Sequence, residues 1–218
     1  PFDTFKDFAP ITNMVSTTPV LVANRDAPFG TLAELAAHAR ANPGKVAYGT
    51  PGVATIPHLA LEMFQAQAGV KLNHIPYKGA TQQIQDLIGG STQLDSQSSL
   101  VVALPHIKEQ RIKALAVLTE RRSPLLPNVP TAREAGFDAL VVAPWFGLGA
   151  PAGVSPAIIQ RLHAALAKGL VSKEVQDKFA ANGISVHPSA SPAAFADYVR
   201  SEYDRWGATI KAGNIKAE

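Results

Sequence analysis

The sequence predicts an α/β protein built on a mostly parallel sheet. Three features indicate this class. Segments of strand and helix character alternate along almost the whole chain. Two expected helix starts carry the same T-x-x-E capping box. Residues 112–118 are apolar throughout, as in a strand buried on both faces. With 218 residues, the chain is long enough for one large domain or two small ones, each with its own core.

The first half of the chain opens on an extended segment, 10–23, that is rich in β-branched residues. Pro19 inside it indicates an edge strand or a crossing between two lobes. Thr31 and Glu34 then begin a helix that ends at Asn42-Pro43-Gly44. The next expected elements are, in order, a strand at 45–49, a helix at 55–67, a strand at 70–75, a helix at 80–88 and a weak strand at 92–96.

The second half continues the alternation. A short helix interrupted at Pro105 is expected within 99–110, followed by the strand 112–118. Thr131 and Glu134 repeat the capping box at the start of a short helix, and 139–148 is expected to be a long strand. Three later helices start at serines, and a strand at 184–187 precedes the last of them. Those helix starts are Ser155-Pro156, Ser172 and Ser191-Pro192.

Composition excludes several classes of protein. The net charge is only +3, and the basic residues are scattered, with Arg121-Arg122 as the one adjacent pair, which argues against a nucleic-acid binder. A mildly positive chain still favours encounter with anionic solutes. The absence of cysteine excludes disulfides, thiolate metal sites and cysteine nucleophiles. No apolar run approaches the length of a membrane span, and no signal peptide is visible, so we expect residue 1 to lie inside a larger protein.

The first candidate ligand site lies in 46–62, where a strand enters a loop and a helix begins directly after it. Gly49 and Gly52 let the backbone approach a ligand closely, and unpaired amides at the helix start favour an anion such as a carboxylate. Thr50 and Thr55 add hydroxyl donors. The alternative is that the glycines only make a tight turn and Thr55 only caps the helix. The loop lacks the phosphate-binding and dinucleotide-binding glycine patterns.

Two further polar segments stand where strands are expected to end. In 74–80, Lys78 could attract a carboxylate and Tyr77 could pack against or hydrogen-bond a ligand; a solvated lysine and a packing tyrosine are equally consistent. In 95–99, Asp-Ser-Gln-Ser-Ser offers many donors in few residues, although a plain polar loop fits as well.

The sequence offers little support for catalysis or for a metal. None of the six histidines stands in an H-x-x-x-H or H-E-x-x-H pair, and no G-x-S-x-G motif is present. A hydrolytic triad of Ser98, His58 and Asp95 would require the three to meet in space. We therefore expect no catalytic residues, no metal site and no cofactor.

An ordered set of segments resembles one family of receptors. YGTPG, HLALEMF, HIPYKGA, QDLIGG, ALPHIK, ALAVLTERRSPLLPNVPTAREAGF and PWFGLGAPAG follow one another as in the Bug-type (TctC-like) receptors of tripartite tricarboxylate transporters. The final helix, S-P-x-x-F-A-x-Y-V-R-x-E-x-x-R-W-G over 191–207, is similar too. The glycine-rich P-F-x-P-G-G segment with which such receptors begin is not in this sequence, so we expect the N-terminal part of the first lobe to be absent from this chain.

The resemblance implies a type II periplasmic binding protein fold, with two α/β lobes joined by two crossing strands and a ligand cleft between them. The second lobe would be 18–141, and 1–17 with 142–218 would form part of the first. In such receptors a small carboxylate is held largely by backbone amides, hydroxyls and water. The ligand-binding residues predicted on this basis are Gly49, Thr50, Gly52, Val53, Ala54, Thr55, His58, Tyr77, Lys78, Gly79, Ala80, Ser96, Ser98 and Trp145.

The function implied is that of a periplasmic receptor, not an enzyme. It would be a monomer that captures a small carboxylate and docks on membrane permease subunits, without nucleic acid. Two alternatives stay open at this point. One is the ligand-sensing effector domain of a transcriptional regulator, because LysR-type effector domains share the two-lobe architecture. The other is a hydrolase that uses Ser98 or another hydroxyl.

Overall fold

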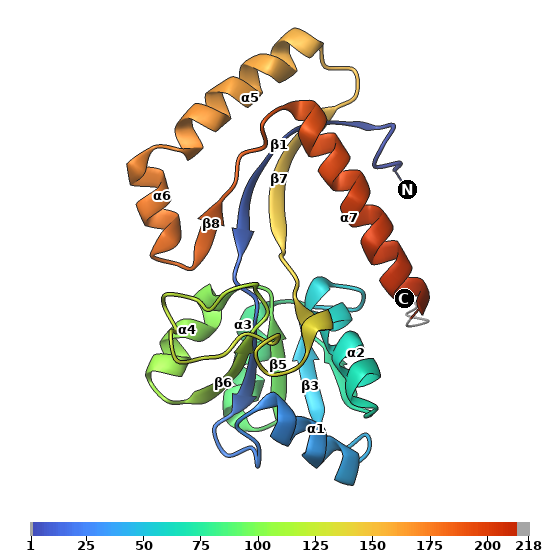
Figure 1. Cartoon of the computed structure of the whole chain (residues 1–218), viewed down its shortest axis with the longest axis vertical. Helices are drawn as coiled ribbons and strands as arrows, with labels where there is room; N and C mark the ends of the chain where they lie inside the picture. The colour runs from blue at the N-terminus through green and yellow to red at the C-terminus, as the bar shows by residue number, and fades with distance from the viewer. Residues whose placement is uncertain (1, 213–218) are drawn as a thin grey trace. The chain divides into compact units, whose positions relative to one another are not determined.

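The fold is described from a computed structural model, and the description covers residues 2–212 (Figure 1). The chain divides into two compact units. Among the described residues, the first unit contains those up to Thr17 together with Trp145–Ala208, and the second contains Thr18–Pro144 and the end of the last helix from Thr209. The lobe boundaries predicted from the sequence, 17/18 and 141/142, stay predictions.

The second unit is built on a five-stranded sheet with the order β4-β3-β5-β2-β6. Its central strand β5 pairs parallel with β3 and antiparallel with β2, and β2 also pairs antiparallel with β6. The sheet is therefore mixed, not mostly parallel as predicted. β2 alone runs opposite to the other four strands of this sheet, and it enters the unit directly from β1 of the other sheet, not from a helix. The strands are β2 (Val20–Asn24), β3 (Ala47–Thr50), β4 (Asn73–Pro76), β5 (Leu94–Gln97) and β6 (Ile112–Val117).

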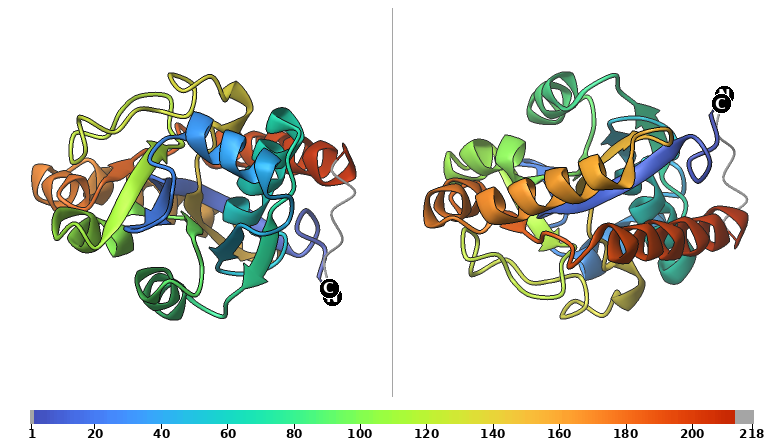
Figure 2. Two further views of the ribbon diagram at one scale, coloured as in Figure 1. Left: turned by 90° about the horizontal axis from the view of Figure 1, so that it is seen from below. Right: turned by 90° about the horizontal axis from the view of Figure 1, so that it is seen from above.

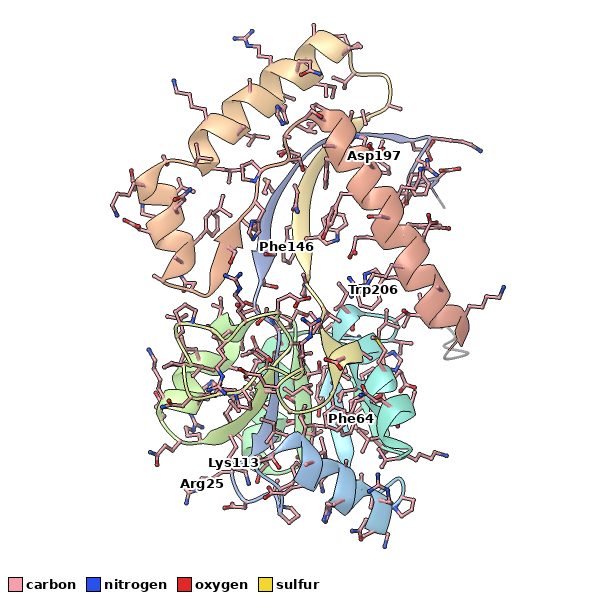
Figure 3. The ribbon with its side chains drawn as sticks, in the orientation of Figure 1. Arg25, Phe64, Lys113, Phe146, Asp197 and Trp206 are labelled. Atoms are coloured by element: carbon pink, nitrogen blue, oxygen red, sulfur yellow. The ribbon has the colours of Figure 1, made fainter. Side chains whose placement is uncertain are left out.

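Helices follow three neighbouring strands of this sheet, since β3, β4 and β5 lead into α2, α3 and α4. Phe64 of α2 is fully buried and packs against Phe137, with ring centroids 5.0 Å apart (Figure 3). Pro105 lies inside α4 without interrupting it, contrary to the prediction. The helices of this unit are α1 (Leu32–Ala41), α2 (Ile56–Ala68), α3 (Ala80–Gly89), α4 (Leu100–Lys108) and the short 3₁₀ helix η1 (Asp138–Leu140).

The first unit has a smaller, three-stranded antiparallel sheet with the order β7-β1-β8. Helix α5 lies over β1 (Figure 2). Large apolar side chains stay exposed on this sheet. Phe146 of β7 (Figure 3) is 54% exposed, and Phe8 of β1 is 42% exposed. The elements are β1 (Phe8–Thr17), β7 (Trp145–Pro151), β8 (Ile184–Val186), α5 (Pro156–Leu170), α6 (Lys173–Ala180) and α7 (Pro192–Ala212).

Two sequence expectations about local structure need correction. Thr131 and Glu134 do form both bonds of a capping box, at 3.1 Å and 2.8 Å, but the segment makes only turns. Gly136, in the left-handed region at φ +84°, ends it before a helix develops. The long strand expected at 139–148 is instead η1, a connecting segment and then β7. No helix among residues 2–212 has the length and apolar character needed to cross a membrane.

Candidate ligand site

The ends of three parallel strands meet at one edge of the second unit's sheet. Thr50 at the end of β3 pairs with Pro76 at the end of β4, and Gly49 pairs with Asp95 of β5. Parallel neighbours present their carboxyl ends at the same edge. The sequence predicts three separate candidate ligand-binding segments. The fold brings them together at this edge: the loop after β3, the segment after β4 and the polar residues of β5.

The loop between β3 and α2 is held by its own hydroxyl groups. The Thr55 hydroxyl donates to the Gly52 carbonyl over 2.7 Å, and the Thr50 hydroxyl lies 3.1 Å from the same carbonyl. Ala54 has φ +59°, a left-handed conformation that costs a residue with a side chain about 1 kcal/mol or more. Backbone strain of this kind tends to gather at binding sites. Both threonines therefore shape the loop, and neither hydroxyl is left aimed at solvent.

The start of α2 leaves peptide N–H groups without partners. The Thr55 side chain makes no cap hydrogen bond, because its hydroxyl is turned to Gly52. Among the described residues, no acceptor is found for the N–H groups of Val53, Thr55 and Ile56. Such groups, together with the helix dipole, favour an anion at this point.

Helix α3 begins in the same way beside it. Gly79 is the N-cap and has no side chain with which to cap the helix. Within the described part of the chain, the N–H groups of Ala80 and Thr81 also lack an acceptor. By contrast, Ser99 caps α4 by accepting a hydrogen bond from the Val101 N–H over 3.3 Å. Two of the three helix starts at this edge are therefore open to an acidic ligand.

Tyr77 and Lys78 differ in how firmly they are held. The Tyr77 N–H donates to the Thr50 carbonyl over 2.9 Å, and its hydroxyl donates to Asp86 Oδ2 over 2.8 Å. Burial, reinforced by the bond to Asp86, raises the pKa of the Tyr77 phenol well above its usual value. Lys78 is exposed and forms no ion pair with any described residue. Tyr77 thus fixes the edge of the loop, whereas Lys78 stays available to attract an anion.

The third polar segment is not an open loop. Asp95, Ser96 and Gln97 all lie within β5 and are at most 1% exposed, because β5 runs between β3 and β2 in the sheet. Ser98 is half-buried just beyond the strand. The Ser96 hydroxyl has no hydrogen-bond partner among the described residues. These side chains mainly build the floor of the site.

Asp95 is the one fully buried acidic group of this floor. Its carboxyl accepts hydrogen bonds from the Gly49 N–H (3.2 Å), the Thr92 hydroxyl (3.2 Å) and the Gln97 amide (3.4 Å). Burial outweighs these donors and raises the pKa of the Asp95 carboxyl to about 8. Gly49 is required beside it, since a Cβ at that position would come within 2.4 Å of Asp95 Oδ1.

Gln83 is a residue of the site that the sequence analysis missed. Its side-chain amide donates to the Gly49 and Ser96 carbonyls, both over 3.1 Å, and so ties β3 to β5 from α3. The Gln83 side-chain carbonyl is buried without a partner among the described residues. The spacing of the sequence could have indicated that Gln83 is buried. It stands next to Ile84 and four residues before Leu87, on the buried face of α3.

His58 lies under the loop and does not join a catalytic triad. Its Nδ1 accepts the Ala54 N–H over 3.0 Å, and its Nε2 lies 3.6 Å from Glu62 Oε1. Both ring nitrogens are thus occupied by groups other than Asp95 or Ser98. A second histidine, His74, stacks on it with ring centroids 4.1 Å apart.

Trp145, the last of the predicted ligand-binding residues, belongs to the first unit. Its ring packs edge-on against Phe195 and Tyr198, at centroid distances of 5.6 Å and 5.5 Å. It helps to line a groove of about 400 Å³ with Phe5, Phe8, Leu148 and Arg200. In the described part of the chain, no group of three or more His, Cys, Asp or Glu side chains could hold a metal ion.

Replacing Asp95 by Asn is expected to remove a pH dependence of stability. A carboxyl with a folded pKa of about 8 and an unfolded pKa near 3.8 favours the folded state most below pH 4, and this contribution is lost as the pH rises toward 8. Urea unfolding at pH 5 and pH 9 should show the wild type losing on the order of several kcal/mol relative to Asp95→Asn. If the free energy of unfolding changes equally with pH in the two proteins, the Asp95 carboxyl is ionised at both pH values and the account of its burial is wrong.

Solved structures place this fold among the periplasmic binding proteins. The adipate-bound protein Rpa4515 of R. palustris superposes with a TM-score of 0.91 at 30% identity, over 98% of this chain and 71% of that one. MatC from Rhodopseudomonas palustris with bound malate gives 0.85 at 26% identity, over 96% and 71%. The fold and the polar edge of the sheet thus define a protein with the two-lobe α/β architecture of the periplasmic solute-binding proteins.

The sequence comparisons identify the family. Residues 1–215 match the model of the tripartite tricarboxylate transporter family receptor, TctC. The protein BugT of Bordetella pertussis is 35% identical over 217 residues, which is 99% of this chain and 66% of that protein. The chain belongs to the TctC receptor family, as the sequence resemblance implied. It spans about two thirds of the length of BugT and of a second curated relative.

Proposed function

We propose that this chain acts as a periplasmic solute receptor that binds a small carboxylate at the starts of α2 and α3 and delivers it to the permease of a tripartite transporter. The observation that carries the proposal is the pair of uncapped helix starts at one sheet edge. Uncapped N–H groups stabilise a carboxylate by short, charge-assisted hydrogen bonds. Two similar solved structures, one with adipate and one with malate, support a small carboxylate as the class of ligand.

The electrostatics of the edge support a carboxylate more than a larger anion. Lys78 is the exposed cation that follows β4, and Asp95 on the floor carries a raised pKa, so a negative charge there is disfavoured below about pH 8. The loop has neither the glycine pattern nor the lysine of a phosphate site. One acid group held mainly by peptide N–H groups fits this arrangement.

A receptor is favoured over an enzyme and over a regulatory domain. The Ser98, His58 and Asp95 side chains do not form the contacts that a hydrolytic triad requires, since His58 uses both nitrogens elsewhere. The family match concerns transporter receptors over nearly the whole chain, which favours transport over transcriptional sensing. A monomer in the periplasm that docks on membrane permease subunits is part of the same proposal.

Removing both loop hydroxyls tests the assignment. Thr50→Ala combined with Thr55→Ala deletes the two groups that hold the Gly52 carbonyl, and each such bond contributes about 1 kcal/mol. Isothermal titration with adipate and malate should show binding weakened roughly ten-fold or more. Thr119→Ala is the matched control, because it removes a hydroxyl-to-carbonyl bond in another loop of the same unit. Equal affinity in the double variant and the wild type would contradict the loop assignment.

A further inference from the structure

Two histidines that are distant in sequence form one stacked pair beneath the loop. The ring planes of His58 of α2 and His74 of β4 lie within 11° of parallel, and Tyr48 of β3 also stacks on His74, with ring centroids 4.9 Å apart. His58 is only 7% exposed. We call His58 and His74 the histidine pair.

Each member of the histidine pair bonds a different end of the loop. His58 Nδ1 accepts the N–H of Ala54, the residue held at positive φ. His74 Nε2 lies 2.6 Å from the Thr50 hydroxyl, which in turn lies 3.1 Å from the Gly52 carbonyl. The loop conformation therefore depends on both imidazoles.

We propose that the histidine pair positions the Thr50–Thr55 loop for its ligand, and that a proton on His58 Nδ1 releases the Ala54 end of the loop. This inference rests on the proposed function, because the loop is the site assigned to the carboxylate. The chemistry is specific: His58 accepts a hydrogen bond at Nδ1 only while that nitrogen carries no proton. A second charge on the stacked neighbour would add repulsion at short range.

The groups around the histidine pair support this role. The titratable groups that contact it in the described residues are Glu62 of α2 and Tyr48 of β3, whose hydroxyl donates to Glu62 Oε1 over 2.9 Å. Burial, and then the charge of His58, lower the pKa of His74 to about 4, with Glu62 opposing in part. His74 is thus neutral near pH 7, which keeps charge away from the centre of the stack.

Two substitutions at His58 separate positioning from simple packing. Asn presents a side-chain oxygen close to the place of Nδ1 but does not titrate, whereas Leu fills space without an acceptor. His58→Leu should weaken adipate or malate binding roughly ten-fold at pH 7.5, the loss of one buried hydrogen bond. His58→Asn should lose less affinity than His58→Leu, because its side-chain oxygen can still accept the Ala54 N–H. His106→Asn, at a histidine outside this cluster, should keep the wild-type affinity.

A measurement without ligand decides the inference separately from the proposed function. Imidazole NMR of the wild-type chain should show His58 in the Nε2–H form at pH 7.5. The protection of the Ala54 amide against exchange, measured relative to its intrinsic rate at each pH, should fall as His58 gains its second proton, and this coupling should vanish in His58→Asn. An Nδ1–H form, or Ala54 exchange independent of His58 titration, would overturn the inference even if carboxylates bind. If the coupling is present but neither acid binds, the proposed function fails and the positioning of the loop stands.

Discussion

Thr55→Asp is expected to weaken carboxylate binding strongly while the fold stays intact. Asp is a preferred N-cap, and its carboxylate would accept the free N–H groups at the start of α2. The variant would carry its own acid group where the ligand's should lie. The free energy of unfolding should stay within about 1 kcal/mol of the wild type, because the new cap bonds offset the lost Thr55-to-Gly52 hydrogen bond. The affinity for adipate or malate should fall roughly a hundred-fold, because two or more charge-assisted hydrogen bonds are lost and like charges repel.

The matched control for this substitution is Ser155→Asp. Ser155 is also an uncapped N-cap in front of a proline-containing first turn, but it precedes α5 in the other unit. It should raise the free energy of unfolding by about 0.5–1 kcal/mol and leave binding unchanged. If Thr55→Asp binds the acids as well as the wild type does, the start of α2 does not hold the carboxylate.

Gly49→Ala is expected to be the most destabilising small substitution at the site. The added Cβ would lie 2.4 Å from Asp95 Oδ1 and 3.0 Å from both Gln83 Cγ and Tyr77 Cε2. All three neighbours are fixed by hydrogen bonds, so the clash cannot be relieved by one flexible side chain. Urea unfolding should show a loss of about 2–4 kcal/mol, in the range of overpacked cores and broken buried networks.

Gly79→Ala provides the comparison for Gly49→Ala. A Cβ at Gly79 meets nothing within 4 Å, and its φ of −177° is open to any residue. This variant should stay within about 0.5 kcal/mol of the wild type, as surface substitutions usually do. Similar stabilities for the two alanine variants would show that the Asp95, Gln83 and Tyr77 side chains move aside freely.

Local signals predicted most of the elements. Thr31 accepts the Glu34 N–H, and the helices expected at Ser155-Pro156, Ser172 and Ser191-Pro192 all begin there. Pro19 lies between the end of β1 and the start of β2, outside both strands. The error at 139–148 has a physical cause. Leu140 and Val142 are buried apolar residues, but only isolated bonds such as Val142 N–H to the Leu118 carbonyl hold the segment, so no ladder forms.

The candidate site was less accessible to sequence reasoning. Strand-to-helix transitions pointed to the loop after β3 and to Tyr77, because those features are local. The burial of Asp95, Ser96 and Gln97 depends on β2 pairing beside β5, which no local pattern encodes. The stacking of His58 on His74 and the bridge made by Gln83 arise from packing between α2, β4 and α3. Lone histidines and a single glutamine carry no spacing signal for such contacts.

The most direct test of the account is a nitrogen-15 NMR titration of the chain with adipate and malate. We expect the amide signals of Val53, Thr55 and Ile56 to move downfield together and to saturate, because a carboxylate becomes their acceptor. Amides of the equally uncapped Ser155 start of α5 should stay in place. Saturable binding that leaves the Val53, Thr55 and Ile56 signals unmoved would contradict the central claim that the start of α2 binds the acid.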